Sequence, residues 1–221
     1  MTTSRTSFAV FFLFLGTLPL CAQFTQWNGL STTWNNSANW TSGIPSAALD
    51  ARVSLGSPSY FDPYVPPPSG SDTAKCNNLQ IQSGGHLHFS DGGVLIVYGT
   101  DKLQNDGSLI LGNGKVIFKN DISFHQGGTF DAGSGTLNFQ GVTWTNKTGS
   151  TFIPGTSSVV LNGTSSQTIQ GNITFYDIEI ANTSGSVSLN GNITVTNSLI
   201  IDSGVSITLS SGSLTLNSTA S

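Results

Sequence analysis

Short apolar strands separated by small-residue turns fill most of this chain. From about residue 76 onward, groups of three to five residues alternate between apolar and polar side chains, and a Gly, Asn or Ser turn follows each group. Such alternation places the apolar side chains on one face of a strand and the polar ones on the other. It predicts strands at residues 78–82, 86–89, 94–98, 109–111, 116–118, 129–130, 137–139, 159–161, 178–180, 187–189, 193–195, 199–201, 205–209 and 214–216.

The strands recur with a regular spacing. The segment GGTFDAGSGTLNFQG at residues 127–141 matches GSTFIPGTSSVVLNG at residues 149–163, which begins 22 positions later. A period of this size is typical of solenoids, in which each coil buries its apolar face against its neighbours. At this spacing, residues 76–221 form about seven coils. An outer-membrane β-barrel also alternates, but its strands need about 9 to 11 residues, and the groups here are shorter.

The one longer apolar run, residues 8–18, follows Arg5 at the start of the chain. It is too short to span a bilayer, and a small residue, Ala22, follows shortly after it. We therefore predict a signal peptide over residues 1–22, cleavage after Ala22, and a secreted or outer-surface location. Lipidation of Cys21 is the alternative, although a lipobox has a small residue where this chain has Leu20.

Residues 23–75 have a different composition from the repeats. Trp27, Trp34 and Trp40, three of the four Trp residues, lie here among Asn and Ser. The first coil of a solenoid needs an atypical cap over its exposed apolar face, and a Trp-rich segment suits that role. Residues 57–72 contain five of the eight Pro residues. Because Pro removes a ladder donor, we expect an irregular loop here rather than a strand.

Composition and charge exclude several classes of protein. Charged residues make up 8% of the chain, and β-branched and turn-forming residues replace the usual helix formers, so we expect no helix after the signal peptide. Losing Arg5 makes the net charge one unit more negative than the −4 of the full chain. An acidic, charge-poor surface releases few phosphate counterions, so we expect no nucleic-acid partner. After cleavage Cys76 is the single Cys, so no internal disulfide is possible, and no second apolar run could span a membrane.

Several motifs resemble those of one family. The pattern W-x-G-x4-W starts at Trp27, N-W-x2-G-x-P starts at Asn39, and Asp50-Ala-Arg-Val and Cys76-Asn-Asn-Leu-Gln-Ile-Gln-Ser-Gly follow. With LNGTSSQTIQG at residues 161–171, they resemble the N-terminal portion of large secreted surface proteins of Bacteroidota-type bacteria. The resemblance implies a right-handed parallel β-helix, adhesin-like, exported and often displayed by type IX secretion. It carries no catalytic residue across.

The candidates for chemistry are few. His86 and His88 share one face of a strand, and two imidazoles can hold a metal together with a third ligand, for which Asp91 is the nearest residue. With Leu87 and Phe89 pointing inward, both His side chains face water, and we expect no bound metal.

Acidic residues recur along the repeats, and a catalytic role for them has to be considered. Parallel β-helix lyases and hydrolases use clustered carboxylates, with calcium or as acid and base. Most of the carboxylates here adjoin Gly or Asn, where Asp forms turns, so we expect no catalytic residue and no cofactor, with calcium as the alternative. The residues concerned are Asp91, Asp101, Asp106, Asp121 and Asp131.

Exposed aromatic side chains can stack on sugars, so Trp27, Trp34, Trp40 and Trp144 are glycan-contact candidates. For the first three, burial in the core of the cap is the favoured interpretation, whereas Trp144 follows a turn and is expected to be exposed.

We therefore expect a non-enzymatic, structural or adhesive solenoid segment of a cell-surface or secreted protein, truncated at its C-terminus. Its partners would be surface glycans or other cell-surface proteins. The alternative is a polysaccharide-binding or polysaccharide-degrading β-helix.

Overall fold

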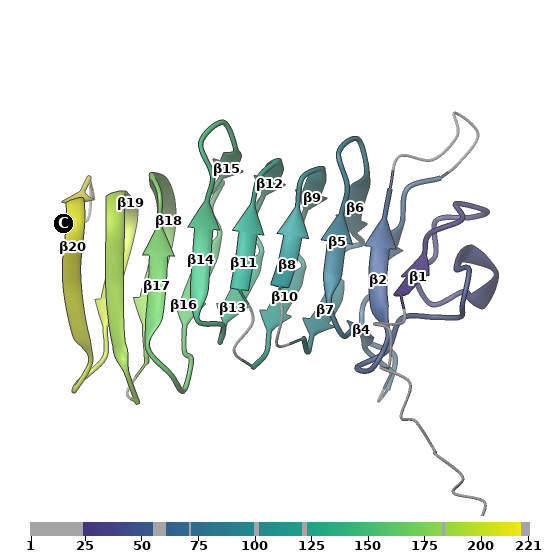
Figure 1. Ribbon diagram of the computed structural model, residues 1–221, viewed down its shortest axis with the longest axis horizontal. Coiled ribbons are helices and arrows are strands. Elements are labelled where there is room, and N and C mark those ends of the chain that lie inside the picture. The colour runs from purple at the N-terminus through teal and green to yellow at the C-terminus, as the bar shows by residue number, and fades with distance from the viewer. Residues whose placement is uncertain are drawn as a thin grey trace, which may run out of the picture.

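The computed structural model describes residues 24–54, 61–70, 72–99, 102–120, 123–182 and 184–217. The predicted signal peptide, Cys21 and Ala22 lie outside these residues. Figure 1 shows a rod in which successive coils stack along the long axis, from β1 at one end to β20 at the other. The strands pair in parallel with the neighbouring coils and form a β-solenoid of about seven turns. The all-β solenoid prediction is therefore confirmed.

Each regular coil contributes one strand to each of three ladders, and β1 extends the first ladder by one strand. The first ladder contains β1 (Phe24–Gln26), β2 (Asp50–Val53), β5 (Leu79–Ile81), β8 (Lys102–Asn105), β11 (Ser123–Gln126), β14 (Thr143–Asn146) and β17 (Gln167–Gln170). The second contains β4 (Ala74–Cys76), β7 (Val94–Val97), β10 (Lys115–Phe118), β13 (Thr136–Phe139) and β16 (Ser158–Leu161). The third contains β3 (Tyr64–Val65), β6 (His86–Phe89), β9 (Ser108–Ile110), β12 (Thr129–Asp131) and β15 (Thr151–Ile153).

The last coils are built from longer strands that bend around the corners. These strands are β18 (Ile173–Ile180), β19 (Ser186–Ile201) and β20 (Ser206–Leu216). The C-terminal half of β18 pairs with β16, and its N-terminal half pairs with the middle of β19. Burial decreases toward β20, where Leu209 and Leu216 are exposed.

In-register pairing places like side chains above one another inside the rod. In the second ladder, one apolar column runs through Leu95, Val116, Leu137, Val159, Ile178 and Leu199. The first five of these side chains are buried. Burying one such side chain fully is worth roughly 1.5–3 kcal/mol, so the columns are the main source of stability in the described rod, where Cys76 is unpaired.

The corners between ladders are tight, and small residues occupy them. A Cβ atom on Gly128 would lie 2.1 Å from the carbonyl oxygen of Gly107, and one on Gly107 would lie 2.2 Å from the carbonyl oxygen of Gly85. The three glycines occupy equivalent corners of successive coils, where the backbones approach too closely for any side chain. The turn glycines of the sequence therefore follow from coil stacking as well as from turn conformation.

The polar side chains that enter the core are hydrogen-bonded across coils. The Asn105 side chain donates to Gln126 Oε1 (2.9 Å) and to the Thr129 carbonyl (2.7 Å), and Gln126 Nε2 donates to the Gly128 carbonyl (2.8 Å). Gln167 Nε2 donates in the same way to the carbonyls of Phe139 (2.9 Å) and Gly141 (2.8 Å). These amides are hydrogen-bonded inside the rod to carbonyls near the corners, and two of those carbonyls, Gly128 and Phe139, also accept a backbone N–H from the next coil.

The N-terminal segment differs from expectation in two details. A 3-10 turn, Ser37–Asn39, occurs within the cap, while no α-helix is found among the described residues. The Pro-rich segment contains β3, which pairs with β6, so the expectation of a loop without a strand is wrong at Tyr64 and Val65. These two residues retain their N–H groups because the prolines, Pro63 and Pro66, flank the strand.

Substitution of the inward columns tests the orientation of the side chains. Leu109→Asp and Ile193→Asp each place an unpaired carboxylate in the core and should lower the free energy of unfolding by more than about 4 kcal/mol. Ser188→Asp changes a side chain on the outer face and should cost no more than about 0.5 kcal/mol. Urea unfolding followed by circular dichroism measures both, and similar losses in all three variants would contradict the orientation.

Candidate functional site

The three Trp residues of the cap form a buried cluster. Trp27 and Trp34 both meet Trp40 edge-on, at ring distances of 5.0 and 4.7 Å, and all three are at most 5% exposed. Trp27 Nε1 donates to the Phe61 carbonyl and Trp40 Nε1 to the Trp34 carbonyl, each at 2.7 Å. The cluster is the core of the cap, and none of its rings presents an open face to a sugar.

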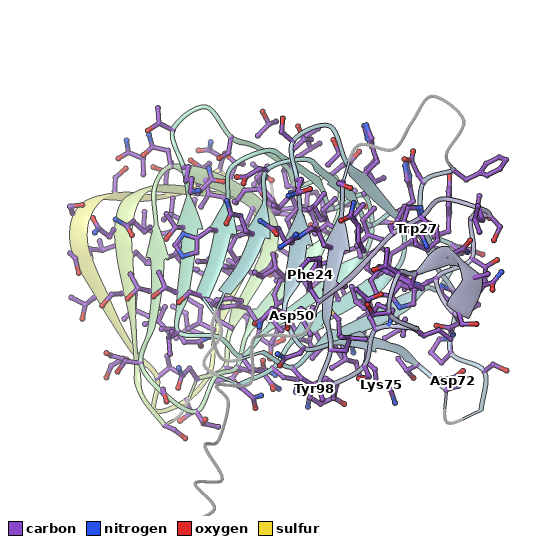
Figure 2. All side chains as sticks on the ribbon, turned by 45° about the vertical axis from the view of Figure 1, so that its right-hand side comes forward. Phe24, Trp27, Asp50, Asp72, Lys75 and Tyr98 are labelled. Atoms are coloured by element: carbon purple, nitrogen blue, oxygen red, sulfur yellow. The ribbon has the colours of Figure 1, made fainter. Side chains whose placement is uncertain are left out.

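The motifs that carry the family resemblance are structural in this chain. The Asp50 carboxylate accepts hydrogen bonds from the Asn77 side chain (2.7 Å) and from both the backbone (3.0 Å) and the side chain (3.0 Å) of Asn78. Arg52 lies over the Phe24 ring (3.8 Å) and donates to Gln80 Oε1 (2.9 Å). Figure 2 shows Phe24 and Asp50 at the N-terminal part of the rod, where both line a small hollow of about 150 Å³. These contacts join the cap to the first coils.

Trp144 is fully buried, so the expectation that it is exposed is wrong. It lies on the inward face of β14 and contacts Phe124 (5.2 Å), Phe152 (5.5 Å), Phe175 (5.6 Å) and Phe139 (5.9 Å) between ring centroids. Its Nε1 has no acceptor within the described part of the chain. The ring is the centre of an aromatic cluster that spans three ladders, and it offers no surface for a glycan.

The acidic turn residues also make contacts within the fold. Asp91 accepts from the Asn113 side chain of the next coil, and Asp131 Oδ1 accepts from the Gly133 N–H at 3.1 Å. Asp106 accepts from the Gln104 side chain and lies 3.9 Å from Lys147 Nζ. Asp101 and Asp121 lie outside the described residues. The described carboxylates of this set accept hydrogen bonds at turns and corners, as the sequence predicted.

One group of side chains has the composition of a metal site. His86 and His88, two residues apart on β6, lie on the outer face as predicted, and Asp62 approaches them from the segment before β3. One ligand atom from each of the three residues lies within 4.8 Å of the other two. Asp91, the third ligand considered from sequence, is not part of this group. Asp62 was missed because only the pairing of β3 with β6 brings it close.

A polar groove of about 400 Å³ lies where the third ladder passes from β15 to β18. Its lining includes Asn146, Ser150, Phe152, Asn172, Thr174 and Asn192. The Asn146 side chain donates to the Asn172 carbonyl (2.7 Å), and Asn172 Oδ1 accepts from the Asn192 N–H (2.9 Å). The groove thus combines an ordered column of amides with the half-buried ring of Phe152.

Cys76 is a buried, unpaired thiol on the inward face of β4. Burial raises the pKa of this thiol well above its usual range, and the Asp50 carboxylate raises it further. The thiol therefore stays protonated and inert in the folded chain, and it is not a nucleophile.

Comparisons of the chain with protein-family models, with curated proteins and with solved structures gave no match in any of the three. Among the described residues, no helix has the length and apolar content needed to cross a membrane. The fold defines the chain as a β-solenoid protein.

Removing the Trp144 ring should act on stability. Trp144→Ala leaves a cavity among five Phe rings, including that of Phe130 at 6.4 Å, and is expected to lower the free energy of unfolding by about 3–5 kcal/mol. Thr145→Ala, on the outer face of the same strand, is the matched control and should change it by at most about 0.5 kcal/mol. Urea titration distinguishes them, and an equally small effect of both would indicate that the indole is not a packing centre.

The Cys76 thiol should make stability depend on pH in the alkaline range. Because its folded-state pKa is raised, its contribution is complete below the unfolded pKa of about 8.5 and is lost as the pH rises above that value. In a chain carrying Cys21→Ser, stability should fall above pH about 8.5 with an extra slope of up to about 1.4 kcal/mol per pH unit, which Cys76→Ala removes. Urea unfolding at a series of pH values measures the slope. Equal slopes in the two chains would show that Cys76 ionises equally in both states.

Proposed function

We propose that this chain is an exported, non-enzymatic rod segment of a bacterial cell-surface protein, with a structural and adhesive role. The observation that supports it is the continuity of the parallel ladders. The pairing of the first ladder continues from β17 to β19 and from β19 to β20, so adjoining coils are joined by backbone hydrogen bonds along the whole described rod. A force along the rod axis loads many of these hydrogen bonds at once.

The outer polar side chains support the same role, because many of them bond to the neighbouring coil. Asn197 donates to Asp177 Oδ1 (2.7 Å), Ser213 donates to Asn192 Oδ1 (3.2 Å), and Thr196 donates to the Phe175 carbonyl (3.1 Å). Side chains used in this way stiffen the stack, and the lateral faces carry few charges and many hydroxyl and amide groups. Such faces suit contact with glycans or with other surface proteins.

Export is tested by expressing the full chain, with residues 1–22, in a bacterium that has an outer membrane. Cell fractionation and N-terminal sequencing should find the chain outside the cytoplasm, beginning at Gln23. Retention in the cytoplasm with an intact N-terminus would contradict export, and a lipid on Cys21, detected by mass spectrometry, would replace cleavage after Ala22.

Adhesion is tested with the folded chain coupled to beads. The beads should bind to glycan arrays or to bacterial surfaces, and assays with acidic and neutral polysaccharides should show no turnover. Reproducible turnover that is lost on Asp101→Ala or Asp121→Ala would replace the structural role with polysaccharide degradation.

The groove beside β15 favours glycan binding as the second candidate function. Its volume falls within the range of small-molecule sites, and sugars are recognised by amide and hydroxyl groups together with an aromatic ring. If the groove binds a glycan, Asn172→Ala and Thr174→Ala should abolish the array signal, while Thr168→Ala on the first ladder should retain it. Binding that survives both groove variants would place the adhesive surface elsewhere.

A further inference from the structure

We propose that Asp62, His86 and His88 bind one Zn²⁺ ion, which joins the Pro-rich segment to the coil that contains β6. This site is independent of the structural role proposed above. It rests on the geometry of a single strand pair near the cap and on the chemistry of its three side chains.

Strand pairing places the three ligands on one face. His86 and His88 are two residues apart on β6, so both imidazoles project outward, while Leu87 and Phe89 between and after them are buried. Tyr64 pairs with His88, so Asp62, two residues earlier, falls beside His86 in the same parallel register. The backbone is held there because the His88 N–H donates to the Pro63 carbonyl at 3.0 Å.

The distances suit a tetrahedral ion. Zinc bonds to His nitrogen and Asp oxygen are about 2.0–2.2 Å long, so two ligands of a tetrahedral site lie about 3.3–3.5 Å apart. His88 Nε2 lies 3.5 Å from Asp62 Oδ2, which matches this separation and is long for a charge-assisted hydrogen bond. The other distances between the ligand atoms of the three residues are all within 4.8 Å. A small rotation of a solvent-facing side chain would shorten them to the spacing of a zinc site.

The surroundings orient the imidazoles and leave the charge of Asp62 available. The Tyr64 ring stacks on the His88 ring at 4.8 Å, with an angle of 11° between the planes. The His86 ring lies 6.3 Å from the His88 ring, with an angle of 19° between the planes. Within the described residues, Asp62 has no Lys or Arg within ion-pair distance, and its one ion-pair contact is with His88. A divalent ion would neutralise this carboxylate, and solvent would supply the fourth ligand.

The donor set selects the kind of ion. Imidazole nitrogen suits zinc, copper and nickel, whereas calcium takes six to eight oxygen ligands and is poorly served by two imidazoles. The cluster therefore differs from the calcium alternative that the acidic turns suggested. A site with three protein ligands that also joins two segments of the chain stabilises the fold when it is filled.

Calorimetric titration of the full chain with zinc chloride tests the proposal. One saturable site per chain is expected, with an increase in melting temperature that excess calcium does not reproduce. Cobalt substituted for zinc should give the visible absorption of a four-coordinate ion, a readout that requires no variant.

Variants assign the ligands, and the chain supplies matched controls. His86→Ala, His88→Ala and Asp62→Asn should each weaken zinc binding by more than about tenfold, because even outer partners of a ligand contribute about 10–100-fold. His125→Ala and Asp91→Asn should leave the affinity unchanged. Circular dichroism confirms that each variant is folded, as expected for substitutions on the outer face.

Three outcomes would overturn the site. These are the absence of saturable binding to the wild-type chain, loss of binding in His125→Ala, and full affinity in Asp62→Asn. The last result would leave a two-His contact without the Pro-rich segment and would reduce Asp62–His88 to a plain ion pair.

Discussion

The in-register parallel hydrogen-bond ladder is the constraint on which the rest of this structure depends. Val94, Lys115 and Thr136 occupy the same position in successive coils, 21 residues apart, and each residue after them inherits that alignment. Because the side chain at a given position must pack on its equivalents in adjacent coils, the interior is organised as columns. In the described part of the chain, where Cys76 is a buried and unpaired thiol, stability depends on these columns. The same constraint excludes side chains from corners such as Gly128, where the next backbone is too close.

The two surfaces proposed as ligand sites, the His–Asp cluster and the polar groove, lie where the third ladder is irregular. The His–Asp cluster lies at its start, where β3 is two residues long and the Pro-rich segment enters the coil. The polar groove lies at its end, beyond β15, where the following strands bend around the corners. Along the regular part of the rod, polar side chains are used in bonds to the neighbouring coil, as for Asp91 and Asn113. At the irregularities, side chains from different strands converge on an open surface, although the amides of the groove are themselves hydrogen-bonded between coils.

The structure also changes how the aromatic residues are understood. Of the four Trp side chains considered as contacts for sugars, the sequence favoured burial of Trp27, Trp34 and Trp40 and exposure of Trp144, and all four lie in the interior. Trp27, Trp34 and Trp40 close the end of the first coils, and Trp144 fills the middle of the rod beside Phe124 and Phe175. Glycan recognition, if it occurs at the groove, would therefore depend on amide and hydroxyl groups and on the partly accessible ring of Phe152. The largest aromatic rings of the chain therefore fill the core and are not available on its surface.

The sequence by itself determined the fold class, because alternation fixes which side chains face inward and a period of about 20 residues fixes the stacking of coils. It also indicated that Leu87 and Phe89 point inward and that His86 and His88 face water. Tertiary structure decided everything that depends on which coil lies beside which. Trp144 follows a turn in the sequence, and its burial results from Phe rings on the adjacent strands and on neighbouring coils, such as Phe152 and Phe124. Asp62 lies 24 residues before His86 in a Pro-rich segment, and no local pattern predicts that a two-residue strand will bring it within reach of both imidazoles.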